Sequence, residues 1–166
     1  MTRKMKPYRR AFALVVIASM AIVIWTSSPY LFVPSGTSTI SLWHAAETFH
    51  QCSRAAPAAQ GPYWLPVASE IDEIEIELES LLIRREHEAL RVPKKFLQYH
   101  RQYIGFVRNK ERLIYVNFSP STDYYHRDWS LLERPVSVCD GGSGYWGIVY
   151  NPQTKQFEEP DFNGVA

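Results

Sequence analysis

The spacing of apolar and polar positions divides the chain into an uncharged N-terminal run, a helical stretch and a strand-rich C-terminal half. Residues 11–25, AFALVVIASMAIVIW, carry no charge. After Ser69 the apolar side chains recur at helical spacing, at Ile71, Ile74, Leu78, Leu81 and Leu82. Ser69 and Asp72 resemble a capping box, and acids crowd the first turns, so this stretch predicts a helix.

After Pro93 the pattern becomes typical of β-strands. Aromatic and β-branched residues fill 96–107, 113–118, 136–139 and 145–150, and 155–162 predicts an edge strand. The glycines of 140–144 permit a tight reversal. A shorter helix is suggested at 41–51, where Leu42, Ala45, Ala46 and Phe49 share a face. This order predicts an α+β fold with one or two helices packed on a four-stranded antiparallel sheet, analogous to a cystatin-like roll.

The uncharged run predicts a membrane segment. A span needs about 20 apolar residues, which 11–25 reaches when extended through 26–33. Five bases and no acid precede the run, so the positive-inside rule predicts a single-pass inner-membrane protein with a cytoplasmic N-terminus and a periplasmic C-terminal domain. A cleaved signal peptide is the alternative, although no A-x-A site follows the run.

These interpretations divide the chain into four segments. Residues 1–10 form a basic cytoplasmic segment and 11–33 a transmembrane anchor or signal peptide. Residues 34–66 are expected to hold a flexible spacer, the short helix and a Pro-rich connection, and 67–166 the α+β exported domain.

Charge limits the partners. The chain has 166 residues and a formal net charge of +1, but five of its 18 bases precede the uncharged run. The remainder therefore carries more acids than bases, which argues against nucleic acid as a partner. We expect the membrane, through 11–33, and an envelope protein as partners, and no cofactor.

The two cysteines, Cys52 and Cys139, have no metal-ligand spacing, and in an oxidising compartment they predict a disulfide. The competing hypothesis is a small exported hydrolase-like enzyme that uses Cys139 or Asp140 with His100 or His126 as base. The five histidines show no metal-binding pair, so no metal site is predicted.

Aromatic residues gather in the C-terminal half. Those in the 119–134 loop and the 140–146 turn are candidates for anchors of a binding surface, although aromatics also fill ordinary cores. The candidates are Tyr124, Tyr125, Trp129, Tyr145 and Trp146.

The C-terminal pattern V-x-V-C-D-G-G-x-x-x-W-G-I-x-Y-N-P-x-T at 136–154, with F-N-G-x-A at 162–166, resembles small exported, membrane-anchored proteobacterial proteins. Tyr99–Tyr103 and Cys52–Arg54 resemble their recurring stretches as well. No activity can be carried over from the resemblance. Because the candidate nucleophile Cys139 is better used in a disulfide and no histidine has a readable partner, we expect a non-catalytic binding or envelope-associated module rather than an enzyme, with the hydrolase as the alternative.

Overall fold

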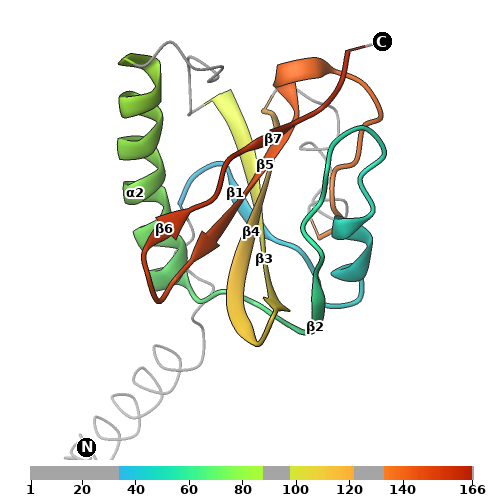
Figure 1. Cartoon of the computed structure of the whole chain (residues 1–166), viewed down its shortest axis with the longest axis vertical. Coiled ribbons are helices and arrows are strands. Elements are labelled where there is room, and N and C mark those ends of the chain that lie inside the picture. The colour runs from blue at the N-terminus through green and yellow to red at the C-terminus, as the bar shows by residue number, and fades with distance from the viewer. Residues whose placement is uncertain (1–33, 88–97, 122–132, 166) are drawn as a thin grey trace, which may run out of the picture. The chain divides into compact units, whose positions relative to one another are not determined.

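The computed structural model describes residues 34–87, 98–121 and 133–165. They belong to one compact unit, Val33–Ala166. Within these residues one α-helix, α2 (Ala68–His87), packs against one face of a seven-stranded sheet, as Figure 1 shows.

The strands differ greatly in length. They are β1 (Thr37–Thr39), β2 (Gln60–Trp64), β3 (Tyr99–Arg108), β4 (Glu111–Pro120), β5 (Trp146–Asn151), β6 (Gln156–Phe157) and β7 (Asp161–Phe162). Two short 3-10 turns, η1 (Ala46–Phe49) and η5 (Gly142–Gly144), complete the elements. The strand order is β1-β3-β4-β5-β6, with β2 also paired to β3 and β7 to β5. Only the β1–β3 pair is parallel among these described strands.

The prediction of a four-stranded antiparallel sheet with one or two helices is wrong, because the sheet is larger and mixed. β1 lies in the expected flexible spacer, and β2 lies in the expected Pro-rich connection. Both segments are short and polar or Pro-containing, and each gains its structure from pairing with β3. The second helix expected at 41–51 is only the 3-10 turn η1.

Residues 136–139 do not form the predicted strand. The Val136 N–H donates to Gln102 Oε1 at 2.8 Å, and the Val136 carbonyl accepts from Asn117 Nδ2 at 3.0 Å. Side chains of the sheet therefore form the hydrogen bonds with the Val136 backbone that a neighbouring strand would otherwise form. The expected edge strand at 155–162 is split into β6 and β7, which pair with opposite ends of β5. The predicted helix after Ser69 corresponds to α2, and 96–107, 113–118 and 145–150 correspond to β3, β4 and β5.

The prediction of a single-pass inner-membrane protein is also corrected. No helix among residues 34–87, 98–121 and 133–165 has the length and apolar character that crossing a membrane requires. The segments on which that prediction was placed, 1–10 and 11–33, lie outside the described residues.

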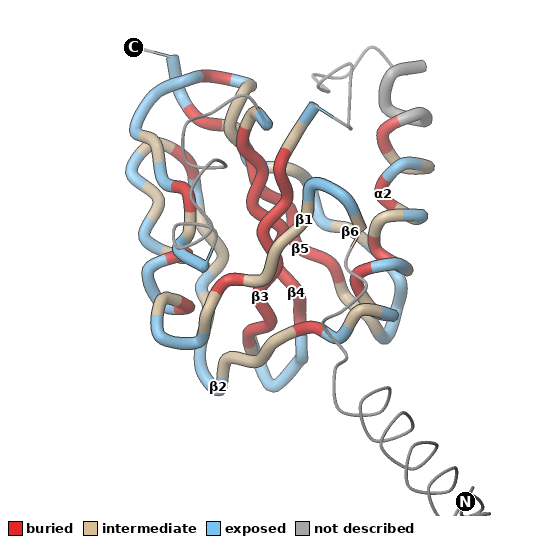
Figure 2. The backbone as a smooth tube through the Cα atoms, turned by 180° about the vertical axis from the view of Figure 1, so that it is seen from behind, coloured by how far each residue is buried: buried red, intermediate tan, exposed pale blue. Residues whose placement is uncertain are grey.

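The sheet is buried on both faces, as the red central strands of Figure 2 show. One face packs against Ile71, Ile74, Leu78 and Leu82 of α2. The other face is covered by the chain around η1 and β2, and this second core consists of Ile40, Ala45, Ile104, Phe106, Leu113, Tyr115 and Val149. Alternate residues of each central strand thus enter different cores.

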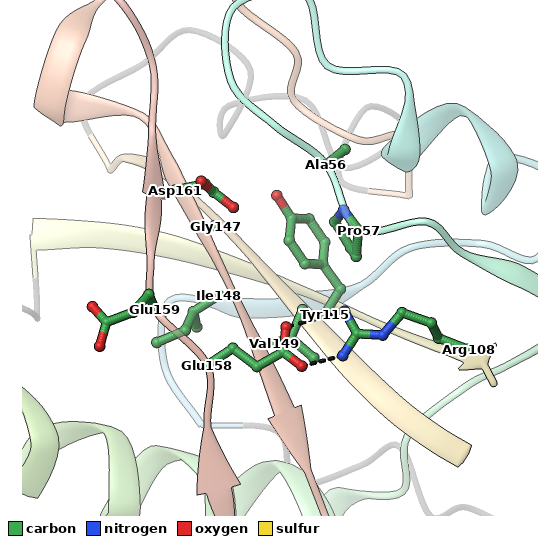
Figure 3. A pocket seen from close by; sticks show the side chains of 10 residues that line it. All are labelled: Ala56, Pro57, Arg108, Tyr115, Gly147, Ile148, Val149, Glu158, Glu159 and Asp161. Carbon is green, nitrogen blue, oxygen red and sulfur yellow. Dashed lines mark hydrogen bonds and ion pairs between the residues drawn. The ribbon is translucent and has the colours of Figure 1, made fainter. Parts of the chain in front are cut away.

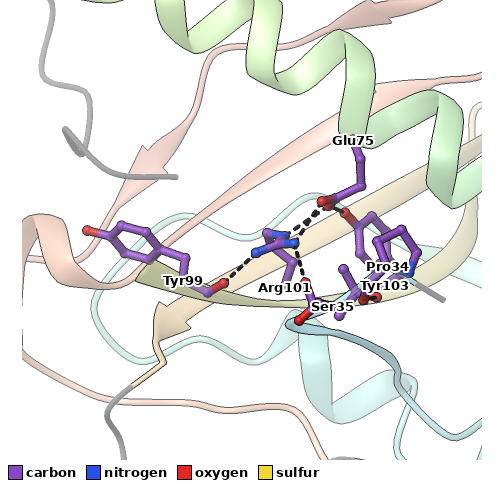
Figure 4. Close-up of polar contacts among 7 residues, drawn as sticks. Pro34, Ser35, Glu75, Tyr99, Arg101 and Tyr103 are labelled. Atoms are coloured by element: carbon purple, nitrogen blue, oxygen red, sulfur yellow. Dashed lines mark hydrogen bonds and ion pairs between the residues drawn. The ribbon is translucent and has the colours of Figure 1, made fainter. Parts of the chain in front are cut away.

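A buried ion pair fixes α2 to the sheet (Figure 4). Arg101, 1% exposed, donates to Glu75 through Nε at 2.9 Å and Nη2 at 2.7 Å. The Tyr103 hydroxyl donates to the same carboxylate. Arg101 also donates to the carbonyls of Tyr99, at 2.6 Å, and Ser35, at 3.0 Å. Because the guanidinium is paired and hydrogen-bonded, its buried charge is compensated, and it joins helix, sheet and the chain before β1.

Candidate functional site

The predicted aromatic anchors have different positions. Tyr124, Tyr125 and Trp129 lie outside the described residues. Tyr145 is partly buried at the end of η5, and its ring covers Gly141, where an added Cβ would lie 2.5 Å from ring atom Cδ2. Trp146 is 1% exposed and stacks on Phe118 with ring centroids 3.5 Å apart. Trp146 is therefore a core residue that no partner reaches directly.

The predicted Cys52–Cys139 disulfide is confirmed. Its Cα atoms are 5.0 Å apart, and the bond ties the chain after η1 to the chain before η5. A sulfur held in a disulfide is not a thiolate nucleophile. Of the histidines named as candidate bases, His126 lies outside the described residues, and His100 Nε2 lies 2.9 Å from Ser38 Oγ.

Next to the disulfide lies a buried arginine whose partners are neutral. Arg54 is 8% exposed and donates to the Tyr115 hydroxyl at 3.2 Å, to Asn163 Oδ1 at 2.7 Å and to Asn117 Oδ1. In the part of the chain that the structure describes, no carboxylate forms an ion pair with it. The three neutral acceptors therefore replace the hydrogen bonds that water would make with the guanidinium group.

The side-chain amides of Asn117 and Asn163, which accept hydrogen bonds from Arg54, extend this network. Asn117 Nδ2 donates to Gln102 Oε1 at 3.0 Å, and Gln102 Nε2 donates to the Arg134 carbonyl at 2.6 Å. Asn163 Nδ2 donates to the carbonyls of Val138, at 2.5 Å, and Asp140, at 3.1 Å. Each side chain bonds to a chain segment that covers the sheet, so the network has a structural role.

A small polar cavity lies between β5, β7 and the chain before β2 (Figure 3). Its lining residues are Ala56, Pro57, Arg108, Tyr115, Gly147, Ile148, Val149, Glu158, Glu159 and Asp161. Arg108 and Glu158 pair with each other there. The cavity measures about 110 Å³, whereas ligand pockets usually exceed about 300 Å³. This volume suits a few water molecules rather than a metabolite.

A larger groove opens where β1 leads into η1. It measures about 310 Å³ and is lined by Thr39, Ser41, Leu42, Trp43, Leu65 and Glu133. Trp43 is 94% exposed and Leu42 is 51% exposed. We call this surface the Trp43 groove. Its volume lies at the lower end of the usual range for binding sites.

The turn that carries Trp43 is anchored on both sides. Ile40 and Ala45 are each 0% exposed. The Ile40 N–H donates to the Tyr103 carbonyl at 2.9 Å, and the Ser41 N–H donates to the Glu133 carbonyl at 2.9 Å. The His44 N–H closes the turn on the Ser41 carbonyl at 2.9 Å. These bonds leave the indole in solvent while the backbone beneath it is fixed.

Sequence reasoning missed Trp43. The apolar face predicted for 41–51 included Leu42, which is exposed, together with Ala45, which is buried. One signal was present: Trp43 does not fall on that apolar face, and a tryptophan on the polar side of an element has no obvious core to enter.

The described residues contain no group of three or more His, Cys, Asp or Glu side chains that could hold a metal ion. No protein-family model matches the sequence, and no curated protein and no solved structure is significantly similar to it, so the resemblance to exported proteobacterial proteins stays a prediction.

Proposed function

We propose that this domain is a non-catalytic binding module that holds a protein partner at the Trp43 groove. The observation that carries the proposal is the 94% exposure of Trp43 on a turn whose flanking residues, Ile40 and Ala45, are fully buried. Single exposed apolar residues are ordinary on protein surfaces. Here, however, the indole adjoins a second exposed apolar side chain, Leu42, and a groove.

Tryptophan is among the residues most enriched at the energetic centres of interfaces, because it brings a large apolar area and one hydrogen-bond donor. A ring held on a fixed turn also loses little backbone freedom when a partner binds. The class of function is the one expected from the sequence, but the proposed binding surface differs from the expected one, because Trp146 belongs to the core.

Selection of a displayed random-peptide library against the full chain tests this proposal. Peptides that bind should lose roughly 30-fold or more in affinity for Trp43→Ala, because interface tryptophans often contribute about 2 kcal/mol or more. Ile76→Ala is the matched control, since Ile76 is an exposed apolar residue on α2, at 67%. That variant should bind like the wild type.

Both variants should melt at the wild-type temperature, because neither side chain is part of a core. Peptides that bind Trp43→Ala as tightly as the wild type would contradict the proposal. A library that yields no binder would do the same.

A further inference from the structure

The Trp43 groove combines an apolar wall with a single acid. Leu42, Trp43 and Leu65 supply the apolar side chains, and Glu133 is the charged residue among those that line it. The backbone of Glu133 is fixed, because its carbonyl accepts from the Ser41 N–H at 2.9 Å. An acidic residue with an anchored main chain therefore lines the same groove as the exposed indole.

The Glu133 carboxylate is not neutralised by a base in the described part of the chain. Within residues 34–87, 98–121 and 133–165, no basic side chain forms an ion pair with it. Glu47, the next acid along the described chain after Trp43, lies outside the groove lining, and its Oε1 is 3.0 Å from His44 Nδ1. Glu133 is therefore the acid that the groove itself presents.

Two polar side chains complete the groove. Thr39 and Ser41 line it, and their hydroxyls can donate to or accept from a peptide backbone. Thr39 belongs to β1, which is the terminal strand in the order of the sheet. An extended segment lying here would meet hydroxyls, apolar side chains and a carboxylate.

We infer that the partner is a protein segment in which an apolar side chain stands next to a lysine or arginine. This inference rests on the proposed function and specifies its ligand. The apolar side chain packs on Trp43, Leu42 and Leu65, and the neighbouring cation pairs with Glu133. An indole face beside a carboxylate also favours a cation through its π-system. An anionic lipid surface is disfavoured, because the Glu133 carboxylate would repel it.

The test uses the peptides selected against the full chain. They should be enriched in an apolar residue adjacent to Lys or Arg, and their binding should weaken as salt rises from about 50 to 300 mM, because screening acts on exposed charges. Glu133→Gln should weaken binding about three- to ten-fold and flatten the salt dependence. Glu79→Gln removes an exposed acid on α2 and should change neither property.

Reversal of the charge at Glu133 gives the most specific test of the partner class. Glu133→Lys should reject the basic peptides and accept the same peptides with their Lys or Arg replaced by Glu. Peptides without basic residues, or binding that Glu133→Gln leaves unchanged while Trp43→Ala abolishes it, would overturn the partner class and leave the proposed function standing. Trp43-dependent binding of the full chain to phosphatidylglycerol vesicles, with no selected peptide, would overturn both.

Discussion

Two residues with positive φ, Asn109 and Lys110, close the hairpin between β3 and β4. Their φ angles are 53° and 71°, and Arg108 and Glu111 are register partners on either side. Two-residue hairpin loops with positive φ at both positions favour Asn followed by Gly. Lysine in the second position is therefore under backbone strain that glycine would not feel.

Lys110→Gly should stabilise the protein by a few tenths to about 1 kcal/mol, because relief of this strain exceeds the added freedom of the unfolded chain. Urea denaturation measures the change. Glu111→Gly is the control, since Glu111 begins β4 and has no positive φ. It should destabilise. A loss of stability in Lys110→Gly would show that the turn tolerates lysine without strain.

The burial of three tyrosines predicts how the stability of the fold changes at high pH. Burial raises the pKa of Tyr103, Tyr115 and Tyr150, and the carboxylates of Glu75 and Glu73 raise those of Tyr103 and Tyr150 further. The native state therefore favours the protonated phenols. Their contribution to stability is complete below the ordinary pKa of about 10 and is lost as pH rises above it.

Stability should accordingly fall between about pH 10 and 12, and phenolate absorbance of the buried rings should appear together with loss of the near-ultraviolet circular dichroism. Tyr150→Phe, which removes one of these phenols, should make the alkaline decline shallower. Ionisation of the buried rings at pH 10 in a protein that stays folded would contradict the assignment of burial as the cause.

Among the elements, β2 depends on one close approach to β3. The Trp64 ring lies directly over Gly105, where an added Cβ would stand 2.2 Å from ring atom Cε2. The Arg112 guanidinium lies on the same ring, 4.1 Å from its centroid. Because Gly105 has no side chain, the Trp64 indole can pack directly on β3, and this contact holds β2 against the sheet.

Gly105→Ala should destabilise the protein by about 1–3 kcal/mol, because Trp64 must move off the sheet. The same change in a Trp64→Ala background should cost clearly less, so the two substitutions are not additive. Gly144→Ala is the matched control: its Cβ would meet Pro120 Cγ at 3.7 Å, an ordinary contact. Full additivity in thermal or urea melts would show that the ring does not depend on Gly105.

Elements whose apolar residues recur with a regular period could be predicted from the sequence. Elements that form only by pairing with another strand could not. α2 and the central strands each present a regular apolar face to a core. β1 has only the polar sequence Thr37–Thr39, and its strand conformation comes from the parallel register with β3. β2 contains Pro62 and Gly61, which read locally as a connection.

The site was harder to predict for the same reason. Trp146, Ile148 and Tyr150 alternate along β5 and all enter the core on the α2 side. Such alternation is compatible with a core position, but Trp146 was predicted as a binding anchor because aromatic residues gather in this half of the chain. Trp43, by contrast, precedes η1 and lies off the apolar face of the expected helix, so its exposure agrees with the local pattern. The groove beside it could not be predicted, because Leu65 and Glu133 come from distant parts of the chain.

At the scale of the whole molecule, the disulfide holds together two coverings of the same sheet face. Cys52 follows η1, and Cys139 precedes η5. Asn163 and Arg54 form hydrogen bonds close to the bridge. The bridge therefore helps keep the second core closed over β3 and β4.

Replacing both cysteines by serine should lower the free energy of unfolding by about 2–5 kcal/mol, because the unfolded chain regains the freedom that the cross-link removes. Reduced wild-type protein is the control and should show the same loss. Equal melting of the oxidised protein and the double variant would mean that the remaining contacts hold the covering segments unaided.

The parallel pairing of β1 with β3 has a consequence for the time course of folding. β3 and β4 are neighbours in sequence, so their hairpin closes a very short loop and can form early. β1 is synthesised well before its partner strand exists, and it stays unpaired until β3 has left the ribosome. Its contacts should then form after the rate-limiting step, so weakening β1 should speed unfolding and leave the folding rate nearly unchanged.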